Sequence, residues 1–90
     1  LRLIQTCGAC PEQYDVYLGD DLVGYMRLRH GRFRVDCRGV TVYNADPRGD
    51  GLFEYDERSG FLNAGCRAIL DSLGQEIKED LFEIEQEQTS

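Results

Sequence analysis

The sequence predicts an α+β domain in which a four-stranded antiparallel β-meander packs against one C-terminal α-helix, followed by a second short acidic helix. Three observations lead to this fold class. The chain has 90 residues, and at that length folding buries only about 60% of the unfolded surface, enough for one hydrophobic core. Residues 14–43 read as strands separated by turn signals. Residues 56–74 carry apolar side chains at helical spacing.

Four strands are expected, at residues 14–18, 22–29, 32–37 and 40–43. The breaks between them are short and contain glycine: Gly19-Asp20-Asp21, His30-Gly31 and Arg38-Gly39. Loops of this length join antiparallel neighbours, because a parallel return needs a longer crossover.

The loop lengths also predict the register. A two-residue loop at His30-Gly31 sets Arg27 opposite Arg34 and Arg29 opposite Arg32. The same reasoning at the other two breaks produces three more pairs, Cys37 with Val40, Val35 with Val42, and Leu18 with Leu22. All loops then place one apolar set on a single face: Tyr14, Val16, Leu18, Leu22, Met26, Leu28, Phe33, Val35, Cys37, Val40 and Val42.

The helix expected over residues 56–74 has Asp56 as its N-cap and Gly74 as its stop. Its inward stripe is Leu62, Cys66, Ile69 and Leu73. Residues 75–87 are expected to form the second, acidic helix, with Ile77, Leu81 and Ile84 on its apolar edge. Residues 44–51 are a loop; their alternating Asp and Gly match a calcium-binding loop poorly, because no helix precedes them.

The net charge of -7 argues against general affinity for nucleic acid. Most of the negative excess lies in the C-terminal segment, where the candidate partner-binding acids are Glu76, Glu79, Asp80 and Glu83. A helix carrying these carboxylates would fit a basic groove, so one expected partner is a basic nucleic-acid-binding protein of a bacterial host.

The second candidate binding surface is the outer face of the sheet. Its members are Arg27, Arg29, Arg32, Arg34, Tyr17, Tyr25 and Tyr43. Like charges directly opposite each other destabilise a sheet, so either the chain's own acids, from Asp15, Asp36 or the tail, compensate them, or the face is a recognition patch. Arg and Tyr are enriched at binding hot spots; a platform for single-stranded nucleic acid is a third, weaker interpretation.

The four cysteines leave three alternatives open. Cys7 and Cys10 have the spacing of half a zinc site, which Cys37 and either Cys66 or His30 would complete. Cys37 and Cys66 equally read as buried apolar side chains. A thiol oxidoreductase using Cys7 and Cys10 is the remaining alternative, although such sites open a helix, whereas Cys10 is followed by a predicted strand. We expect no enzymatic activity.

Residues 10–17 and 23–35, which read CPEQYDVY and VGYMRLRHGRFRV, resemble small uncharacterised proteins of bacterial phages and prophages. The resemblance implies a standalone accessory protein, and small acidic proteins in that setting include anti-CRISPR inhibitors of host RNA-guided nucleases. No binding residue is carried over, because those families share no common motif.

Cytoplasmic location is expected as well. No apolar run approaches the roughly 20 residues of a membrane-spanning helix, and residues 1–4 are too short an apolar segment for a signal-peptide core. The sequence thus predicts a small acidic inhibitor that binds a host protein, with a zinc-stabilised interaction module as the alternative.

Overall fold

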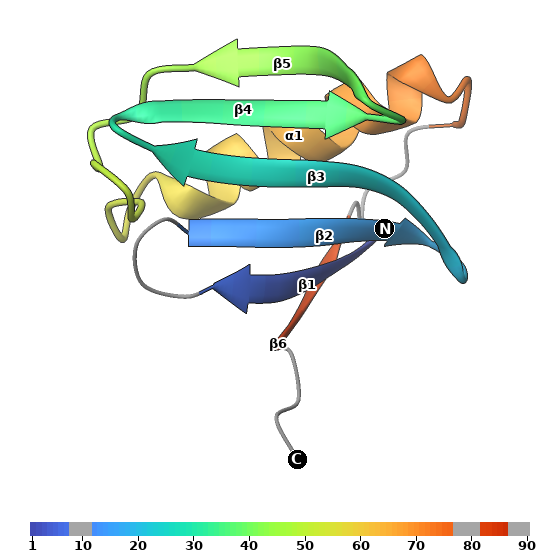
Figure 1. Ribbon diagram of the computed structural model, residues 1–90, viewed down its shortest axis with the longest axis horizontal. Coiled ribbons are helices and arrows are strands. Elements are labelled where there is room, and N and C mark those ends of the chain that lie inside the picture. The colour runs from blue at the N-terminus through green and yellow to red at the C-terminus, as the bar shows by residue number, and fades with distance from the viewer. Residues whose placement is uncertain (8–11, 77–81, 87–90) are drawn as a thin grey trace.

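The structure is a computed structural model that describes residues 1–7, 12–76 and 82–86. The elements in these ranges are β1 (Arg2–Cys7), β2 (Glu12–Leu18), β3 (Asp21–Arg29), β4 (Arg32–Cys37), β5 (Val40–Ala45), α1 (Arg58–Ser72) and β6 (Glu83–Gln86). The strands form one mixed sheet in the order β5-β4-β3-β2-β1-β6, and α1 lies across one of its faces (Figure 1). The predicted α+β class is therefore confirmed.

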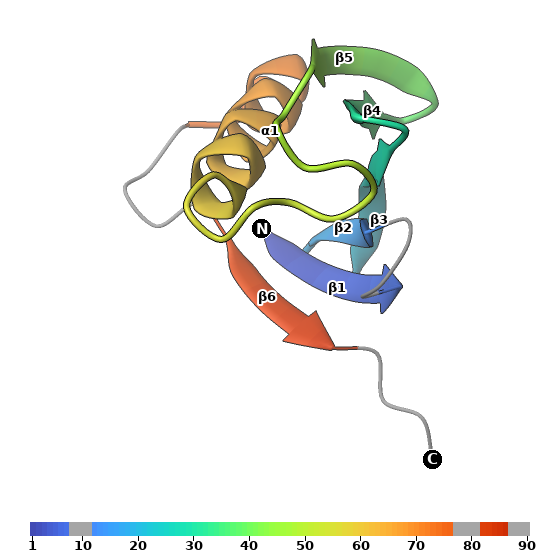
Figure 2. The ribbon, with the colours of Figure 1, turned by 90° about the vertical axis from the view of Figure 1, so that its left-hand side faces the viewer.

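The predicted meander corresponds to β2, β3, β4 and β5, which pair antiparallel in chain order. Two strands were not predicted. β1 pairs antiparallel with β2, and β6 pairs parallel with β1 at the far edge of the sheet. Figure 2 shows the sheet edge-on, with α1 against one side only. The opposite side, which we call the outer face, has no helix over it among the described elements.

The acidic helix predicted over residues 75–87 is wrong for residues 83–86, which form β6. The backbone N–H of Glu83 donates to the carbonyl of Leu1 at 3.0 Å, and Ile84 lies opposite Leu3. Residues 82–85 alternate between apolar and acidic side chains, a period of two that suits an edge strand. Residues 77–81, including Ile77 and Leu81 of the predicted apolar edge, lie outside the described residues.

The register predicted around His30-Gly31 is confirmed, with Arg27 opposite Arg34 and Arg29 opposite Arg32. The pair of Cys37 and Val40 is also confirmed. The pair of Val35 with Val42 is wrong, because an irregularity in β5 sets Val35 opposite Tyr43 instead. The extra residue at this bulge lets Val42 and Tyr43 both pack partly buried against the core.

A second bulge corrects the pairing of Leu18 with Leu22. The loop between β2 and β3 is shorter than predicted, so that Leu18 lies opposite Asp21 and Tyr17 opposite Leu22. The register then shifts by one residue, which turns Val23 into the core at 3% exposure. Leu22, predicted to be buried, is 59% exposed on the outer face. Val40 is also exposed, at 65%; it is the first residue of β5, next to the Arg38-Gly39 turn.

The inner stripe of α1 is confirmed for Leu62, Cys66 and Ile69, which are buried, and for Leu73, which packs partly buried against the core. The helix sits close to the sheet at two glycines. A Cβ atom at Gly24 would lie 2.8 Å from Cδ1 of Ile69, and one at Gly65 would lie 2.9 Å from Cγ2 of Val35. Side chains at these positions would push α1 away from the sheet.

The start of the helix differs from the prediction. The N-cap residue is Glu57, which makes no side-chain capping hydrogen bond, and Asp56 forms an ion pair with Arg48. The Glu57 carboxylate folds back over the preceding loop and accepts backbone N–H bonds of 2.8 Å from Arg48, Gly49 and Glu54. Burial raises the pKa of the Glu57 carboxyl. The three N–H donors and the Arg48 charge together lower this pKa by more than burial raises it, so the net shift is downward.

The predicted stop of the helix is confirmed. Gly74 adopts φ 71°, a conformation that costs glycine little. Its N–H bonds to the carbonyl of Asp71 at 3.1 Å, and the N–H of Gln75 bonds to Leu70 at 2.9 Å.

Glu12 joins the sheet, the loop and the helix. It is 1% exposed, and its carboxylate accepts hydrogen bonds from Nε and Nη2 of Arg58 at 3.0 and 3.1 Å and from the N–H of Phe53 at 3.1 Å. The Tyr14 hydroxyl also donates to it. Since the Glu12 N–H donates to the carbonyl of Gly51 at 2.7 Å, both ends of this residue hold the loop before α1.

Replacing this carboxylate should destabilise the fold. We expect Glu12→Gln to lower the free energy of unfolding by about 3 kcal/mol, the lower end of the cost of removing one partner from a buried ion pair, because Arg58 stays partly exposed. The new amide NH₂ is itself a donor, and it would face donors whose hydrogen bonds the carboxylate now accepts. Urea denaturation measures the change.

Glu54→Gln is the matched control, since Glu54 is an exposed acid in the same loop whose hydrogen bonds to described residues come from its backbone N–H and carbonyl, which the substitution leaves in place. It should leave stability within about 0.5 kcal/mol of the parent protein. Equal effects of the two substitutions would contradict the role given to Glu12.

Candidate functional site

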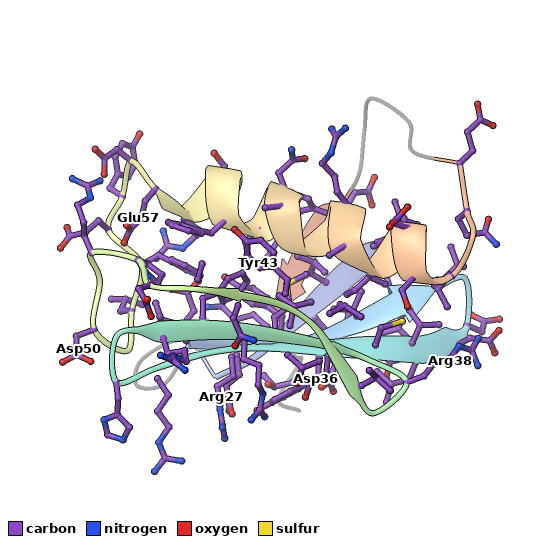
Figure 3. The ribbon with its side chains drawn as sticks, turned by 90° about the horizontal axis from the view of Figure 1, so that it is seen from above. Arg27, Asp36, Arg38, Tyr43, Asp50 and Glu57 are labelled. Carbon is purple, nitrogen blue, oxygen red and sulfur yellow. The ribbon has the colours of Figure 1, made fainter. Side chains whose placement is uncertain are left out.

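Four arginines gather on the outer face of β3 and β4. Arg27 and Arg29 come from β3, and Arg34 and Arg32 lie directly opposite them on β4. Their parity in the strands is opposite to that of the buried Met26, Leu28, Phe33 and Val35. We call these four side chains the arginine face; Figure 3 shows Arg27 on the side of the sheet away from α1.

The arginine face surrounds a shallow depression. Its volume is about 320 Å³, and its lining consists of the four arginines and His30. The β3–β4 hairpin turn positions His30 with φ 53°, next to Gly31 with φ 72°. The four guanidinium groups around this depression only donate hydrogen bonds, so its chemistry suits a carboxylate or a phosphate.

The chain compensates these charges only in part. Nε of Arg34 lies 3.4 Å from Asp36, and Nε of Arg32 lies 3.5 Å from the exposed Asp46. The Nε atom of Arg34 is buried and has no hydrogen-bond acceptor within the part of the chain that the structure describes. Arg29 donates to Nε2 of His30 at 3.2 Å. Arg27 forms no ion pair with any described residue.

The described acids of the C-terminal segment lie elsewhere. Glu83 is on β6, three strand spacings from β3, which is about 14 Å at roughly 4.8 Å per spacing. Glu76 follows α1 and is exposed. Glu79 and Asp80 lie outside the described residues. The two predicted binding surfaces are thus separate for those members that the structure places.

The three tyrosines predicted for the outer face divide. Tyr17 lies there, with the Arg2 guanidinium 5.2 Å from its ring centroid, and the Tyr25 hydroxyl donates to Gln13. Tyr43 is a correction: the β5 bulge turns it to the inner face, where its ring centroid lies 6.1 Å from that of Phe33. Figure 3 shows Tyr43 between the sheet and α1.

The outer face has a second depression that the sequence did not indicate. It measures about 260 Å³ and lies at the opposite end of β3 and β4 from the hairpin, with Leu22, Tyr25, Asp36 and Arg38 in its lining. Leu22 was missed because the bulge at Val23 reverses its expected direction. A glycine two residues after Leu22, within a strand pattern, was the available signal.

The cysteines predicted as zinc ligands are not brought together as one set. Cys37 shares a row of the sheet with Gly24, Val16 and Leu3, whereas Cys7 lies four residues beyond Leu3 on β1. Since Cys7 pairs with Gln13, three residues from Val16, the two backbone positions are about 14 Å apart across the strands and about 10 Å apart along them, farther than two ligands of one zinc ion. Cys10 lies outside the described residues, and no cluster of three metal-ligating side chains occurs within the described ranges.

Cys37 and Cys66 are free thiols in the core. Burial raises the pKa of Cys66 to about 12, which keeps this thiol protonated and unreactive at neutral pH. The thiol oxidoreductase alternative concerns Cys7 and Cys10 and stays a prediction.

Cys66 should make the protein sensitive to alkali. The unfolded thiol ionises near pH 9 while the folded one holds its proton to about pH 12, so the free energy of unfolding falls as pH rises through this window, by up to about 1.4 kcal/mol per pH unit. Urea denaturation between about pH 8 and pH 10 should show a shallower decline for Cys66→Ala than for the parent protein. Parallel declines would refute this assignment.

Comparison with known proteins leaves the geometry as the basis for a function. No protein-family model, curated protein or solved structure matches the chain. Among the described residues, no helix has the length and apolar character to cross a membrane.

Proposed function

We propose that this protein is a non-enzymatic binding protein and that the arginine face is its binding surface for an acidic segment of a protein partner. One observation carries the proposal: four arginines in directly opposed pairs line one depression and are only partly compensated by described acids. Opposed like charges cost a sheet about 0.2 to 1 kcal/mol per pair. Binding of an anionic partner would neutralise the opposed charges and offset this destabilisation.

Arginine supports the recognition of carboxylates in particular. Each guanidinium presents two parallel N–H donors that match the two oxygens of a carboxylate. The opposed pairs Arg27–Arg34 and Arg29–Arg32 offer two such positions, separated by two residues of strand, or roughly 6.7 Å. This is the spacing between alternate side chains of an extended peptide.

The acidic C-terminal segment is the weaker candidate surface. Its prediction as a partner for a basic groove depended on carboxylates at helical spacing, and residues 83–86 form a strand instead. The predicted role as a phage-derived inhibitor of a CRISPR nuclease or another nucleic-acid-handling complex stays a prediction. An inhibitor using the arginine face would bind an acidic part of such a complex.

Binding can be tested with a short probe. We expect a seven-residue peptide, with aspartate at its first and third positions and serine elsewhere, to shift the backbone amide signals of β3 and β4 in a nuclear magnetic resonance titration at low salt. Arg27→Gln should weaken binding about tenfold, since a hydrogen bond to a charged group contributes about 1.5 to 3 kcal/mol. The same substitution should raise the free energy of unfolding by a few tenths of a kcal/mol, because it removes the repulsion from Arg34.

Arg67→Gln is the control, because Arg67 is exposed on α1, against the other side of the sheet. It changes the net charge equally and should alter the peptide affinity by less than about twofold, as expected of a distant screened charge. Equal losses from Arg27→Gln and Arg67→Gln, or shifts confined to other elements, would contradict the proposal.

A further inference from the structure

The two depressions of the outer face lie along the same pair of strands. From the hairpin turn, successive outward rows of β3 and β4 are Arg29 with Arg32, then Arg27 with Arg34, then Tyr25 with Asp36. The row beyond them holds Leu22, which lies opposite Tyr17 on β2 and lines the second depression. The surface thus changes along one direction from the arginine pairs, through the row of Tyr25 and Asp36, to the exposed Leu22, with Arg38 also in the lining of the second depression.

The length of this track is set by β3. Leu22 lies seven residues before Arg29, and the bulge at Val23 shortens the path to about 20 Å at roughly 3.3 Å per residue. An extended peptide of seven residues covers the same length. Its first, third, fifth and seventh side chains would face the four rows in turn.

Leu22 is a candidate contact for an apolar side chain. It is a large aliphatic side chain with 59% exposure, next to a depression of about 260 Å³. A single exposed leucine is ordinary in a protein surface. Leu22, however, borders a depression on the same face as the arginine pairs. Its distance from Arg29 is the length of one short extended peptide.

The middle row discriminates between kinds of anionic partner. Asp36 accepts a hydrogen bond of 2.8 Å from the Thr41 hydroxyl and lies next to Arg34, so its carboxylate is held in place on this face. A single-stranded nucleic acid following the track would present a phosphate at each row, including this one, where it would meet a carboxylate. The net charge of -7 opposes it as well.

From this order of rows we infer that the outer face binds an extended segment of a protein partner. The first and third side chains of this segment are acidic, the fifth is uncharged and the seventh is apolar. This inference rests on the proposed function, since it extends the arginine face to a longer track. The arginine pairs bind the carboxylates, Asp36 rejects a third acid, and Leu22 packs against the apolar side chain.

The experiment compares four probes on the full chain by nuclear magnetic resonance titration. The first is the acidic peptide with serine at its seventh position, and the second has leucine there. The third adds an aspartate at the fifth position of the second, and the fourth is a seven-nucleotide oligothymidylate. Leucine should tighten binding about fourfold to fifteenfold, the effect of burying one to two methylene equivalents, and the added aspartate should reverse that gain.

Two variants locate these effects. Leu22→Ser should abolish the gain from leucine, whereas Val40→Ser should retain it, because Val40 is equally exposed but does not line the depression. Asp36→Asn keeps an oxygen for the Thr41 hydroxyl and should restore affinity for the third peptide. Thermal unfolding of each variant confirms that the fold is retained.

The outcomes separate this inference from the proposed function. If the first two peptides bind equally well, or if Val40→Ser abolishes the gain as fully as Leu22→Ser does, the extended track is refuted while the arginine face stands. If no peptide binds at the arginine face, the proposed function fails. Tighter binding of oligothymidylate than of the leucine peptide overturns the choice of a protein partner.

Discussion

The buried carboxylate of Glu12 is the point at which the sheet, the long loop and the helix are joined. Its hydrogen bonds reach Arg58 at the first turn of α1, Phe53 in the loop and Tyr14 on its own strand. A carboxylate at 1% exposure is costly unless its oxygens are satisfied. Because the donors come from the strand, the loop and the helix, the carboxylate oxygens are fully satisfied only when all three are in place.

The placement of α1 decides which side of the sheet carries the proposed binding surface. Anchored at Glu12, the helix approaches the sheet closely at Gly24 of β3 and at its own Gly65, and it buries the apolar side chains of the meander. The alternate side chains of β3 and β4, which include the four arginines, then face away from it (Figure 3). The aromatic cluster of Phe33, Phe53 and Phe61, with ring centroids 5.0 to 6.2 Å apart, closes the core beneath the loop.

Local signals in the sequence sufficed for the meander and for the opposed arginines, because a two-residue loop containing Gly31 determines the register of β3 and β4. These local signals did not predict the two bulges, since each bulge depends on packing across the sheet. A bulge reverses the inward and outward alternation of the side chains in its strand. For this reason Leu22 and Tyr43 lie on the faces opposite to those predicted. The strand β6 was missed because its pairing with β1 is between the two ends of the chain. No local pattern in the sequence singled out Glu12, since its partner Arg58 is 46 residues away.

The central claim is that the arginine face is a cationic surface that described acids compensate only in part, and we propose that an anionic partner binds there. A double-mutant cycle on Arg27 and Arg34, using Arg27→Gln, Arg34→Gln and the double variant in urea denaturation at low salt, measures this directly. The account predicts an unfavourable coupling of about 0.2 to 1 kcal/mol between the two arginines in the free protein. A coupling of zero or a favourable one would mean that the chain neutralises its own arginines, and it would contradict the account.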